Sequence, residues 1–349
     1  MTTLSEIAPK ARNAIQYSAF ALVFLIVGRV ILTAAVAYWK QLNPPPPPPP
    51  DVKFGKIPKL EFPSTDQPKF TYTLQTATGG LPSKLPGQFK VFFMPIKKPS
   101  LLAYDGAKAI AGKLDFIQDP KKLSESDYRW DATDPVPSSL TMDIITGSFT
   151  MDRTWQSDQS YLTPTLYYTD SQAVDRTFNL LSRVDLLPDD IKTGTNTIAY
   201  LKADKGQLVP AVSLSQSNFI QINLYRQEVD NTPCVYASTE HGPITAILAL
   251  QREDTKQFIH LAYNYFPVDM TTSAVYPLIT VADAWQRMQN GQGYIAGVKS
   301  TASAVTVTDV SLGYYDSDTP QQYLQPVYVF KGDNNFVGYV PAVADNWVQ

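Results

Sequence analysis

The sequence predicts an α+β protein, in which one N-terminal transmembrane helix precedes helices packed on antiparallel sheets. The first observation is an apolar stretch at residues 14–39, with seven consecutive prolines shortly after it. The second is that the chain is rich in Thr, Val and aromatic residues, with 20 Tyr and 16 Phe, which favour strands. The third is that short amphipathic segments alternate with these strands. We therefore expect two or three repeated helix-plus-sheet units, at 89–165, 166–277 and 278–349.

Residues 14–39 make up the predicted transmembrane helix. Ser18–Trp39 alone would span about 33 Å as a helix, slightly more than the roughly 30 Å hydrocarbon core of a bilayer. Tyr17 lies at one end and Tyr38 at the other, where aromatic rings settle at the membrane-water boundary. Residues 1–13 would then form a short cytoplasmic tail, and the C-terminal part would be extracytoplasmic at the cell membrane.

Orientation and cleavage of this segment stay open on the residues alone. Cations lie on both sides, with Lys10 and Arg12 before the stretch and Lys40 after it, so the charges barely favour one orientation. The same N-terminal cations, followed by Ala35–Ala37, are also typical of a cleaved signal peptide. The length of the apolar stretch and the internal Arg29 favour a retained anchor.

Arg29 lies inside the apolar stretch, where a cation costs about 2.5 to 3.5 kcal/mol on insertion scales. One interpretation is that Arg29, beside Gly28, contacts a helix of another membrane protein or of a second copy of this chain. The alternative is that Arg29 extends toward one membrane surface and has no protein partner.

Two extended segments follow the helix. Residues 40–51 contain the seven prolines, which predict a stiff polyproline II stalk of roughly 22 Å. Residues 52–88 are rich in Pro, Lys, Thr and Gly and predict an extended linker that runs along the domain. We expect Phe54, Leu60 and Phe62 to attach this linker to it.

The first unit, 89–165, begins with an apolar strand that ends at Pro95. A helix follows, with Asp105 as its N-cap and small apolar residues at three- and four-residue spacing. From Leu140 the chain alternates between apolar and polar residues, and Thr146-Gly147 predicts a hairpin turn.

The second unit, 166–277, begins with a helix capped by Asp170 or Ser171, after which strands dominate. The segment KLDFIQDP from Lys113 is similar to RVDLLPDD from Arg183. This similarity indicates a weak internal repeat, with chance as the alternative.

Alternation in the later strand FIHLAYNYF predicts Phe258 and His260 on one face and Ile259 and Leu261 on the other.

The third unit, 278–349, has the clearest pattern, with a helix capped by Thr280 and then three strands. Its successive motifs TVADAW, VSLGYY, LQPVYVF and YVPAV resemble the C-terminal part of the YycH/YycI type of bacterial proteins and of related PepSY-like envelope modules. The resemblance covers residues 278–343. It implies a short cytoplasmic tail, one span, an extracytoplasmic α+β domain, and a regulatory role through binding of a sensor histidine kinase.

Bulk composition limits the function classes. A net charge of −3 and 17% charged residues provide no positive field for nucleic acid. The single cysteine rules out an intramolecular disulfide, and no Asn-x-Ser/Thr acceptor occurs, which favours a bacterial envelope protein.

The sequence contains few residue groupings that are typical of a catalytic or metal site. The histidines, His241 and His260, and the cysteine, Cys234, do not have the spacing of zinc ligands. Asp316 and Asp318 lie in a loop without the glycine and terminal Glu of an EF-hand. We therefore expect no catalytic residue, no metal and no cofactor.

Asp127, Asp131 and Asp134 cluster around Trp130, beside further aromatic residues. Such a ring could stack on a sugar, so these residues are the candidate surface for a glycan or a protein partner. An alternative is an enzyme that acts on envelope glycans, with Asp131 and Asp134 as its acid-base pair. Aspartates in loops more often cap backbone groups.

These observations favour a membrane-anchored extracytoplasmic binding or regulatory protein of the bacterial cell envelope. It would engage a protein partner or a cell-wall polymer without catalysis. An architectural component of a surface layer or secretion apparatus, built from many copies, is a further alternative.

Overall fold

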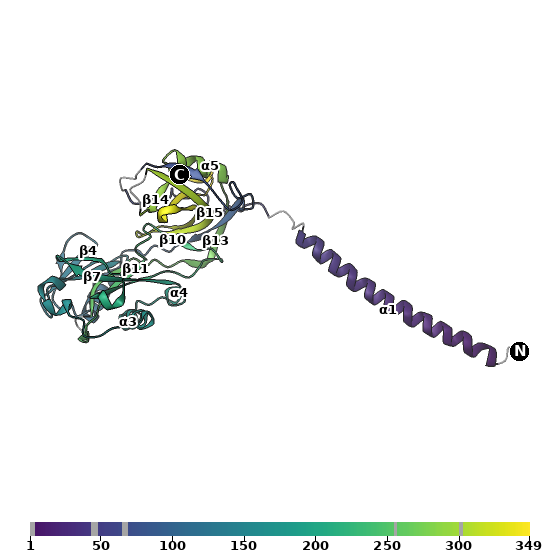
Figure 1. Cartoon of the computed structure of the whole chain (residues 1–349), viewed down its shortest axis with the longest axis horizontal. Helices are drawn as coiled ribbons and strands as arrows, with labels where there is room; N and C mark the ends of the chain where they lie inside the picture. The colour runs from purple at the N-terminus through teal and green to yellow at the C-terminus, as the bar shows by residue number, and fades with distance from the viewer. Residues whose placement is uncertain (1–3, 43–47, 65–68, 255–256, 300–302) are drawn as a thin grey trace. The chain divides into compact units, whose positions relative to one another are not determined.

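The computed structural model describes residues 4–42, 48–64, 69–254, 257–299 and 303–349. The chain divides into two compact units, Met1–Pro49 and Pro50–Gln349, and the second unit is called the body here. Figure 1 shows the first unit as one helical rod and the body as strands with short helices. The described residues thus have the predicted α+β class, with two sheets in the body.

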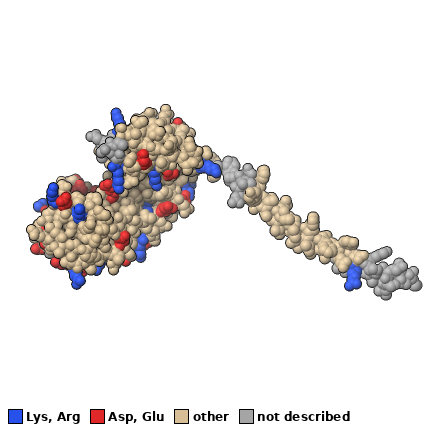
Figure 2. All heavy atoms as spheres, viewed as in Figure 1, with Lys and Arg blue, Asp and Glu red and all other residues tan. Residues whose placement is uncertain are grey.

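The rod is helix α1, Leu4–Leu42. Within it, Gln16–Trp39 is long and apolar enough to cross a membrane, which fits either a membrane anchor or a signal sequence. The helix extends past the predicted bounds of 14–39 because the flanking residues include helix formers such as Leu, Ala, Lys and Gln. Figure 2 shows few charged side chains along the described part of the rod on the side in view.

The predicted stalk, residues 40–51, is described only in part. Its first three residues belong to α1, and Pro48–Pro50 are neither helix nor strand. Pro44–Pro47 lie outside the described residues, as do residues 1–3 of the predicted tail.

The described helices of the body are α2 (Ala103–Lys113), α3 (Asp170–Arg183), α4 (Asp189–Lys192) and α5 (Val281–Gln289). The strands are β1 (Thr71–Leu74), β2 (Gln88–Phe93), β3 (Lys121–Lys122), β4 (Asp127–Ala132), β5 (Ser138–Asp143), β6 (Phe149–Arg153), β7 (Asn196–Asp204), β8 (Gln207–Pro210), β9 (Phe219–Leu224), β10 (Cys234–Tyr236), β11 (Ile244–Ala249), β12 (Phe258–Tyr263), β13 (Asp269–Pro277), β14 (Tyr294–Gly297), β15 (Ala304–Asp316), β16 (Tyr323–Gly332) and β17 (Val337–Pro341).

Nine strands form an antiparallel sheet in the order β3-β4-β5-β6-β12-β11-β9-β7-β8. Helices α2 and α3 cover one face of it. The buried cluster between them joins helix residues such as Ala111 and Leu181 to strand residues such as Leu140, Ile222 and Leu261. This face is the helix-covered face of the sheet, and the other is called the open face.

Helices α2 and α3 end in the same way. Asp115 and Asp185 follow them with positive φ angles of 71° and 58°. In each case the next amide bonds back five residues, from Phe116 to the Ala111 carbonyl and from Leu186 to the Leu181 carbonyl. This is the Schellman pattern of a helix C-terminus. The similar segments KLDF and RVDL thus adopt the same local structure.

The helix starts differ from the predictions in two of three cases. Thr280 caps α5 as predicted, since its hydroxyl accepts from the Asp283 amide. The cap of α3 is Thr169, which forms a capping box with Gln172, so Asp170 lies inside the first turn. Asp105 also lies within the first turn of α2. A carboxylate at that position interacts favourably with the positive end of the helix dipole.

The eight-stranded sheet has the main order β1-β15-β16-β17-β14, with β2 pairing with both β13 and β16, and β10 pairing with β15. Helix α5 packs on it through Ala284 and Met288. The predicted linker, 52–88, contributes β1, and its three predicted contacts are confirmed. Leu60 is buried, Phe54 stacks near Tyr323, and Phe62 packs between Tyr294 and Tyr315.

The strands are not distributed as the three predicted units would require. β2, from the unit 89–165, belongs to the eight-stranded sheet, whereas β3–β6 belong to the nine-stranded sheet. In the unit 166–277, β10 and β13 also belong to the eight-stranded sheet. The nine-stranded sheet is therefore built from residues that lie between β2 and β13, two strands that pair with each other.

A β-bulge changes the predicted alternation of β12. Ile247 lies opposite His260 whereas Leu248 lies opposite Phe258, so Ile259 is an extra residue. Phe258 consequently packs against the helix-covered cluster, and Ile259 packs in a separate cluster on the open face. The prediction that Phe258 shares a face with His260 is wrong for this reason.

Candidate functional site

The open face of the nine-stranded sheet carries a row of polar side chains. On β9, Ile220 and Ile222 face the helices, so the intervening Gln221 and the following Asn223 face the other way. Thr245 on β11 and His260 on β12 extend this row across the sheet. Side-chain donors and acceptors thus form the middle of this face.

Two cavities lie along this row. One has a volume of about 590 Å³ and is lined by Asp152, Trp155, Ile247 and His260 among others. The second has a volume of about 870 Å³ and lies between the open face and residues of the eight-stranded sheet such as Gly332. Both cavities are lined by Gln221 and His241. The two cavities are therefore neighbours, and together they are called the polar groove here.

The segment Ser238–Gly242 lies over the open face between the two cavities. The carbonyl of Glu240 accepts hydrogen bonds from Gln221 Nε2 at 2.9 Å and from Asn223 Nδ2 at 3.0 Å. Thr245 Oγ1 donates to Asn223 Oδ1 at 3.0 Å, which orients that amide. Two side chains of the sheet thus fix the Glu240 carbonyl, and a third orients one of them. The exposed side chains of Glu240 and His241 therefore project from a defined backbone.

An aspartate and a histidine are paired in the smaller cavity. His260 Nδ1 lies 2.7 Å from Asp152 Oδ1, and the two side chains are 27% and 61% exposed. Because the carboxylate fixes the ring through Nδ1, Nε2 remains the ring atom available for another partner.

The larger cavity has cations at its far end. Lys299 and Lys331 line it and are exposed, and Glu240 is the acidic residue in its lining. Within the described residues, no ion pair involves either lysine. This end of the groove would favour an anionic substituent.

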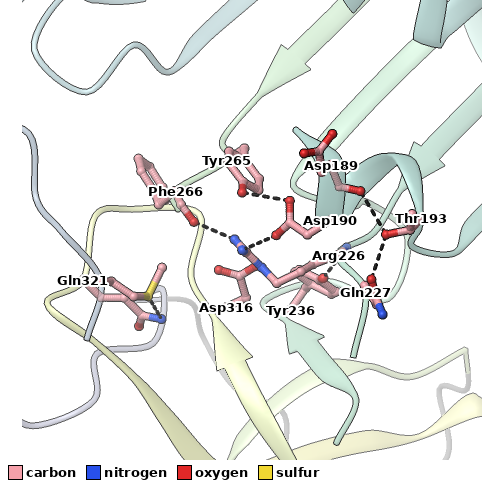
Figure 3. Close-up of polar contacts among 11 residues, drawn as sticks. Asp189, Asp190, Thr193, Arg226, Gln227, Tyr236, Tyr265, Phe266, Asp316 and Gln321 are labelled. Carbon is pink, nitrogen blue, oxygen red and sulfur yellow. Dashed lines mark hydrogen bonds and ion pairs between the residues drawn. The ribbon is translucent and has the colours of Figure 1, made fainter. Parts of the chain in front are cut away.

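Arg226, which follows β9, joins chain segments that belong to both sheets (Figure 3). Its Nε donates to Asp316 Oδ2 at 3.0 Å, its Nη1 to Asp190 Oδ2 at 2.6 Å, and its Nη2 to the Phe266 carbonyl at 2.6 Å. The guanidinium also lies 4.7 Å from the centre of the Tyr265 ring. Asp190 belongs to α4 and Asp316 ends β15, so one side chain joins the two sheets.

This group of residues is structural rather than reactive. The Arg226 side chain is 2% exposed and that of Asp316 is 3% exposed. Burial alone would lower the pKa of Arg226, but Asp316 and Asp190 more than offset this and raise it. Burial raises the pKa of the Asp316 carboxyl, with Arg226 acting in the opposite direction. The cluster therefore holds a cation that stays charged.

The predicted glycan surface differs from the structure at Trp130. This residue is completely buried in the cluster beneath α2 and α3, because it points to the helix-covered face of β4. It is not a surface for stacking a sugar, contrary to the prediction. Asp131 faces the opposite way and bonds to Arg129 and Lys121, which lower the pKa of its carboxyl. A general acid requires a raised pKa, so Asp131 does not suit that role.

The other predicted site residues lie apart from the groove. Asp134 is exposed in the turn between β4 and β5 and does not line either cavity of the groove. Arg29 and Gly28 are exposed on α1, and a side chain at Gly28 would meet no atom within 4 Å.

Among the described residues, no group of three or more His, Cys, Asp or Glu side chains is arranged to hold a metal ion. Cys234 lies close to Arg226 and Asp316, and burial raises the pKa of its thiol. Asp316 is occupied by Arg226 rather than available to calcium.

Sequence reasoning missed the groove and Arg226. The alternation in FIQINLY predicts that Gln221 and Asn223 share one face of the strand. It does not indicate which face of the sheet the helices cover.

Comparison with known proteins adds a weak structural similarity. The sequence matches no protein-family model and no curated protein. Nine chains of solved structures match it, among them an uncharacterized protein from Eubacterium rectale ATCC 33656. That match has 9% sequence identity and a TM-score of 0.34, and it covers 73% of this chain and 82% of the other.

Proposed function

We propose that this chain is a membrane-anchored, extracytoplasmic binding protein of the bacterial envelope, and that its body binds a cell-wall polymer along the polar groove. The observation that carries the proposal is that two neighbouring cavities share Gln221 and His241 in their linings. Single ligand pockets commonly have volumes of about 300–1,000 Å³, so two neighbouring cavities of about 590 and 870 Å³ suit a ligand of several linked units.

The lining of the groove suits a carbohydrate chain. Sugars present hydroxyl groups at their edges and C–H groups on their faces. Ile247, Ile259 and Trp155 provide apolar surface in the smaller cavity, and Gln221, with its neighbours in the row, provides donors and acceptors. Lys299 and Lys331 in the larger cavity would bind an acidic substituent on the polymer.

The groove is formed before any ligand binds. The larger cavity lies between residues of both sheets, so its width depends on how the sheets are joined. Arg226 joins them through bonds to Asp190 and Asp316. A preformed site loses less conformational entropy on binding, which favours affinity for a weakly charged polymer.

Cosedimentation of the full chain in detergent with purified cell-wall sacculi tests this proposal, with cellulose as an unrelated polymer. Ala199 is exposed on the open face and lines the larger cavity, so Ala199→Trp would fill the groove without disturbing the core. Val212, which is 92% exposed, provides the matched control Val212→Trp. We expect native chain and Val212→Trp to sediment with sacculi, and Ala199→Trp to bind at least about tenfold more weakly. Equal binding of cellulose, or unchanged binding of Ala199→Trp, contradicts the proposal.

A membrane partner for α1 is a second candidate, and Arg29 favours it. A cation within the apolar segment Gln16–Trp39 is stabilised by a carboxylate or by close packing of another helix beside Gly28. Together with the resemblance of residues 278–343 to YycH/YycI-type proteins, this supports regulation of a membrane protein, such as a sensor kinase, by a polymer-binding body.

A further inference from the structure

The segment between β2 and α2, Pro95–Leu102, is a projecting loop with apolar side chains in solvent. Every residue of it is exposed. Leu101 is 100% exposed, Leu102 72% and Ile96 50%. Single exposed apolar residues are common, but three within eight residues of one loop form a concentrated apolar surface.

The backbone of this loop is ordered by local hydrogen bonds that leave the leucines outside. The amide of Leu102 donates to Ser100 Oγ at 3.2 Å, and the amide of Ala103 donates to the Ser100 carbonyl at 3.1 Å. Lys97 Nζ donates to the Thr146 carbonyl at 3.0 Å, which attaches the base of the loop to the β5–β6 turn. The conformation therefore presents both leucines without using them in the core.

The charged residues of the loop are all positive. Lys97 and Lys98 precede the leucines, and the sequence PIKKPSLL contains no acidic residue. A lysine near an anionic lipid surface strengthens binding by about fivefold. Aliphatic side chains flanked by lysines are typical of segments that bind the membrane interface. Protein interfaces are instead enriched in aromatic residues and arginine and depleted in lysine.

The length of the connection limits how far the start of the body can lie from the end of α1. Seven residues, 43–49, separate α1 from the body, so their fully extended length is at most about 25 Å. The body begins beside β13, where Asp51 Oδ1 accepts from the Val275 amide at 2.8 Å. Val275 pairs with Lys90, and β2 rises about 10 Å from Lys90 to Phe93 at its end.

We propose that Pro95–Leu102 docks the body onto the lipid surface, with Leu101 and Leu102 inserted among the lipids and Lys97 and Lys98 at anionic headgroups. Such a contact is weak by itself, but the covalent connection to α1 gives it a high effective concentration. Docking would fix the orientation of the body relative to the membrane. The inference does not depend on what the polar groove binds.

Fluorescence quenching in nanodiscs tests the proposal on the full chain. In a Cys234→Ala background, Ser100→Cys carries an environment-sensitive fluorophore, and the discs contain phosphatidylglycerol, phosphatidylcholine and a spin-labelled lipid. We expect a blue shift and strong quenching at this position. Leu101→Ser/Leu102→Ser should abolish both signals, and Val212→Ser, which removes an exposed apolar side chain elsewhere, should leave them unchanged.

Three results would overturn the inference. The first is quenching that persists in Leu101→Ser/Leu102→Ser, since proximity from the tether alone would then explain it. The second is the same quenching with a fluorophore at Ser213→Cys, beside Val212. The third is lipid-independent self-association of residues 50–349 that Leu101→Ser/Leu102→Ser abolishes, which would make the loop a contact between copies of this chain.

Discussion

Arg226 and Asp316 form a hydrogen-bonded ion pair of 3.0 Å between two different sheets, with both side chains almost fully buried. Arg226 follows β9 of the nine-stranded sheet, and Asp316 ends β15 of the eight-stranded sheet. The same guanidinium bonds to Asp190 on α4 and to the Phe266 carbonyl on the segment that leads from β12 to β13. One side chain thus controls how the sheets, and the groove between them, are held together.

Arg226→Met should destabilise the body by about 3–5 kcal/mol, because it leaves the buried Asp316 carboxylate without its counter-charge. Urea unfolding followed by tryptophan fluorescence measures this. Arg176→Met is the matched control, since Arg176 pairs with Asp254 at 3.5 Å on the surface, and we expect a loss of less than about 1 kcal/mol. A similar small loss for both variants would show that the buried cluster contributes little to stability. Adding Asp316→Leu to Arg226→Met should recover part of the lost stability.

The stability of the body should also depend on pH through Asp316. Burial raises the pKa of its carboxyl above the ordinary value of 3.8. A carboxyl with a higher pKa in the folded chain than in the unfolded chain binds protons preferentially in the folded chain. Its contribution to stability is therefore present below the unfolded pKa and is lost as the pH rises through the folded pKa.

Asp316→Asn isolates this contribution, because the amide oxygen can still accept from Arg226 Nε. We expect the free energy of unfolding of the native chain to fall, relative to Asp316→Asn, as the pH rises from about 4 toward neutrality. Urea unfolding across that range measures the difference. The opposite trend would mean that attraction by Arg226 outweighs burial and lowers the pKa.

Gly194→Ala should displace α4 from Arg226. A Cβ at Gly194 would overlap the Tyr225 carbonyl oxygen and lie 2.9 Å from the Asp190 carbonyl oxygen. Both are backbone atoms, so they cannot move aside as a flexible side chain would, and we expect a loss of about 2–3 kcal/mol. Gly206→Ala is the comparison, since Gly206 has a φ of 79° but open space around it. Its loss should be about 1 kcal/mol, measured in the same unfolding assay. Equal losses would show that the close approach at Gly194 is unimportant.

Local features of the sequence predicted much of the secondary structure and one hairpin, but not the pairing of strands far apart in the sequence. Thr280 and the Thr146-Gly147 turn were predictable because a cap and a tight turn depend on neighbouring residues, and Gly147 has the required positive φ. β2 and β13 pair although the whole nine-stranded sheet lies between them in sequence. No local pattern carries that information, so three consecutive units were predicted where two sheets share the chain.

The candidate site was harder to predict for the same reason. Trp130 and Asp131 are neighbours in sequence, but alternation along β4 places them on opposite faces, one buried and one half-buried. Gln221 and His260 are far apart in sequence and become neighbours of one cavity only through the order of strands β9, β11 and β12. The role of Arg226 could not be predicted from its neighbours in sequence, because its partners come from three other segments of the chain.

Arg29→Leu should weaken association of the full chain with a membrane partner. If Arg29 faces a carboxylate or a closely packed helix, leucine removes the specific contact while making α1 more apolar. Affinity capture from detergent-solubilised membranes, followed by mass spectrometry, should recover a membrane protein with the native chain and at least about tenfold less of it with Arg29→Leu. Leu32→Ile, which keeps the segment apolar, is the control and should behave like the native chain. Equal recovery with all three chains, or recovery of only this protein and wall fragments, would mean that α1 serves as an anchor without a regulatory contact.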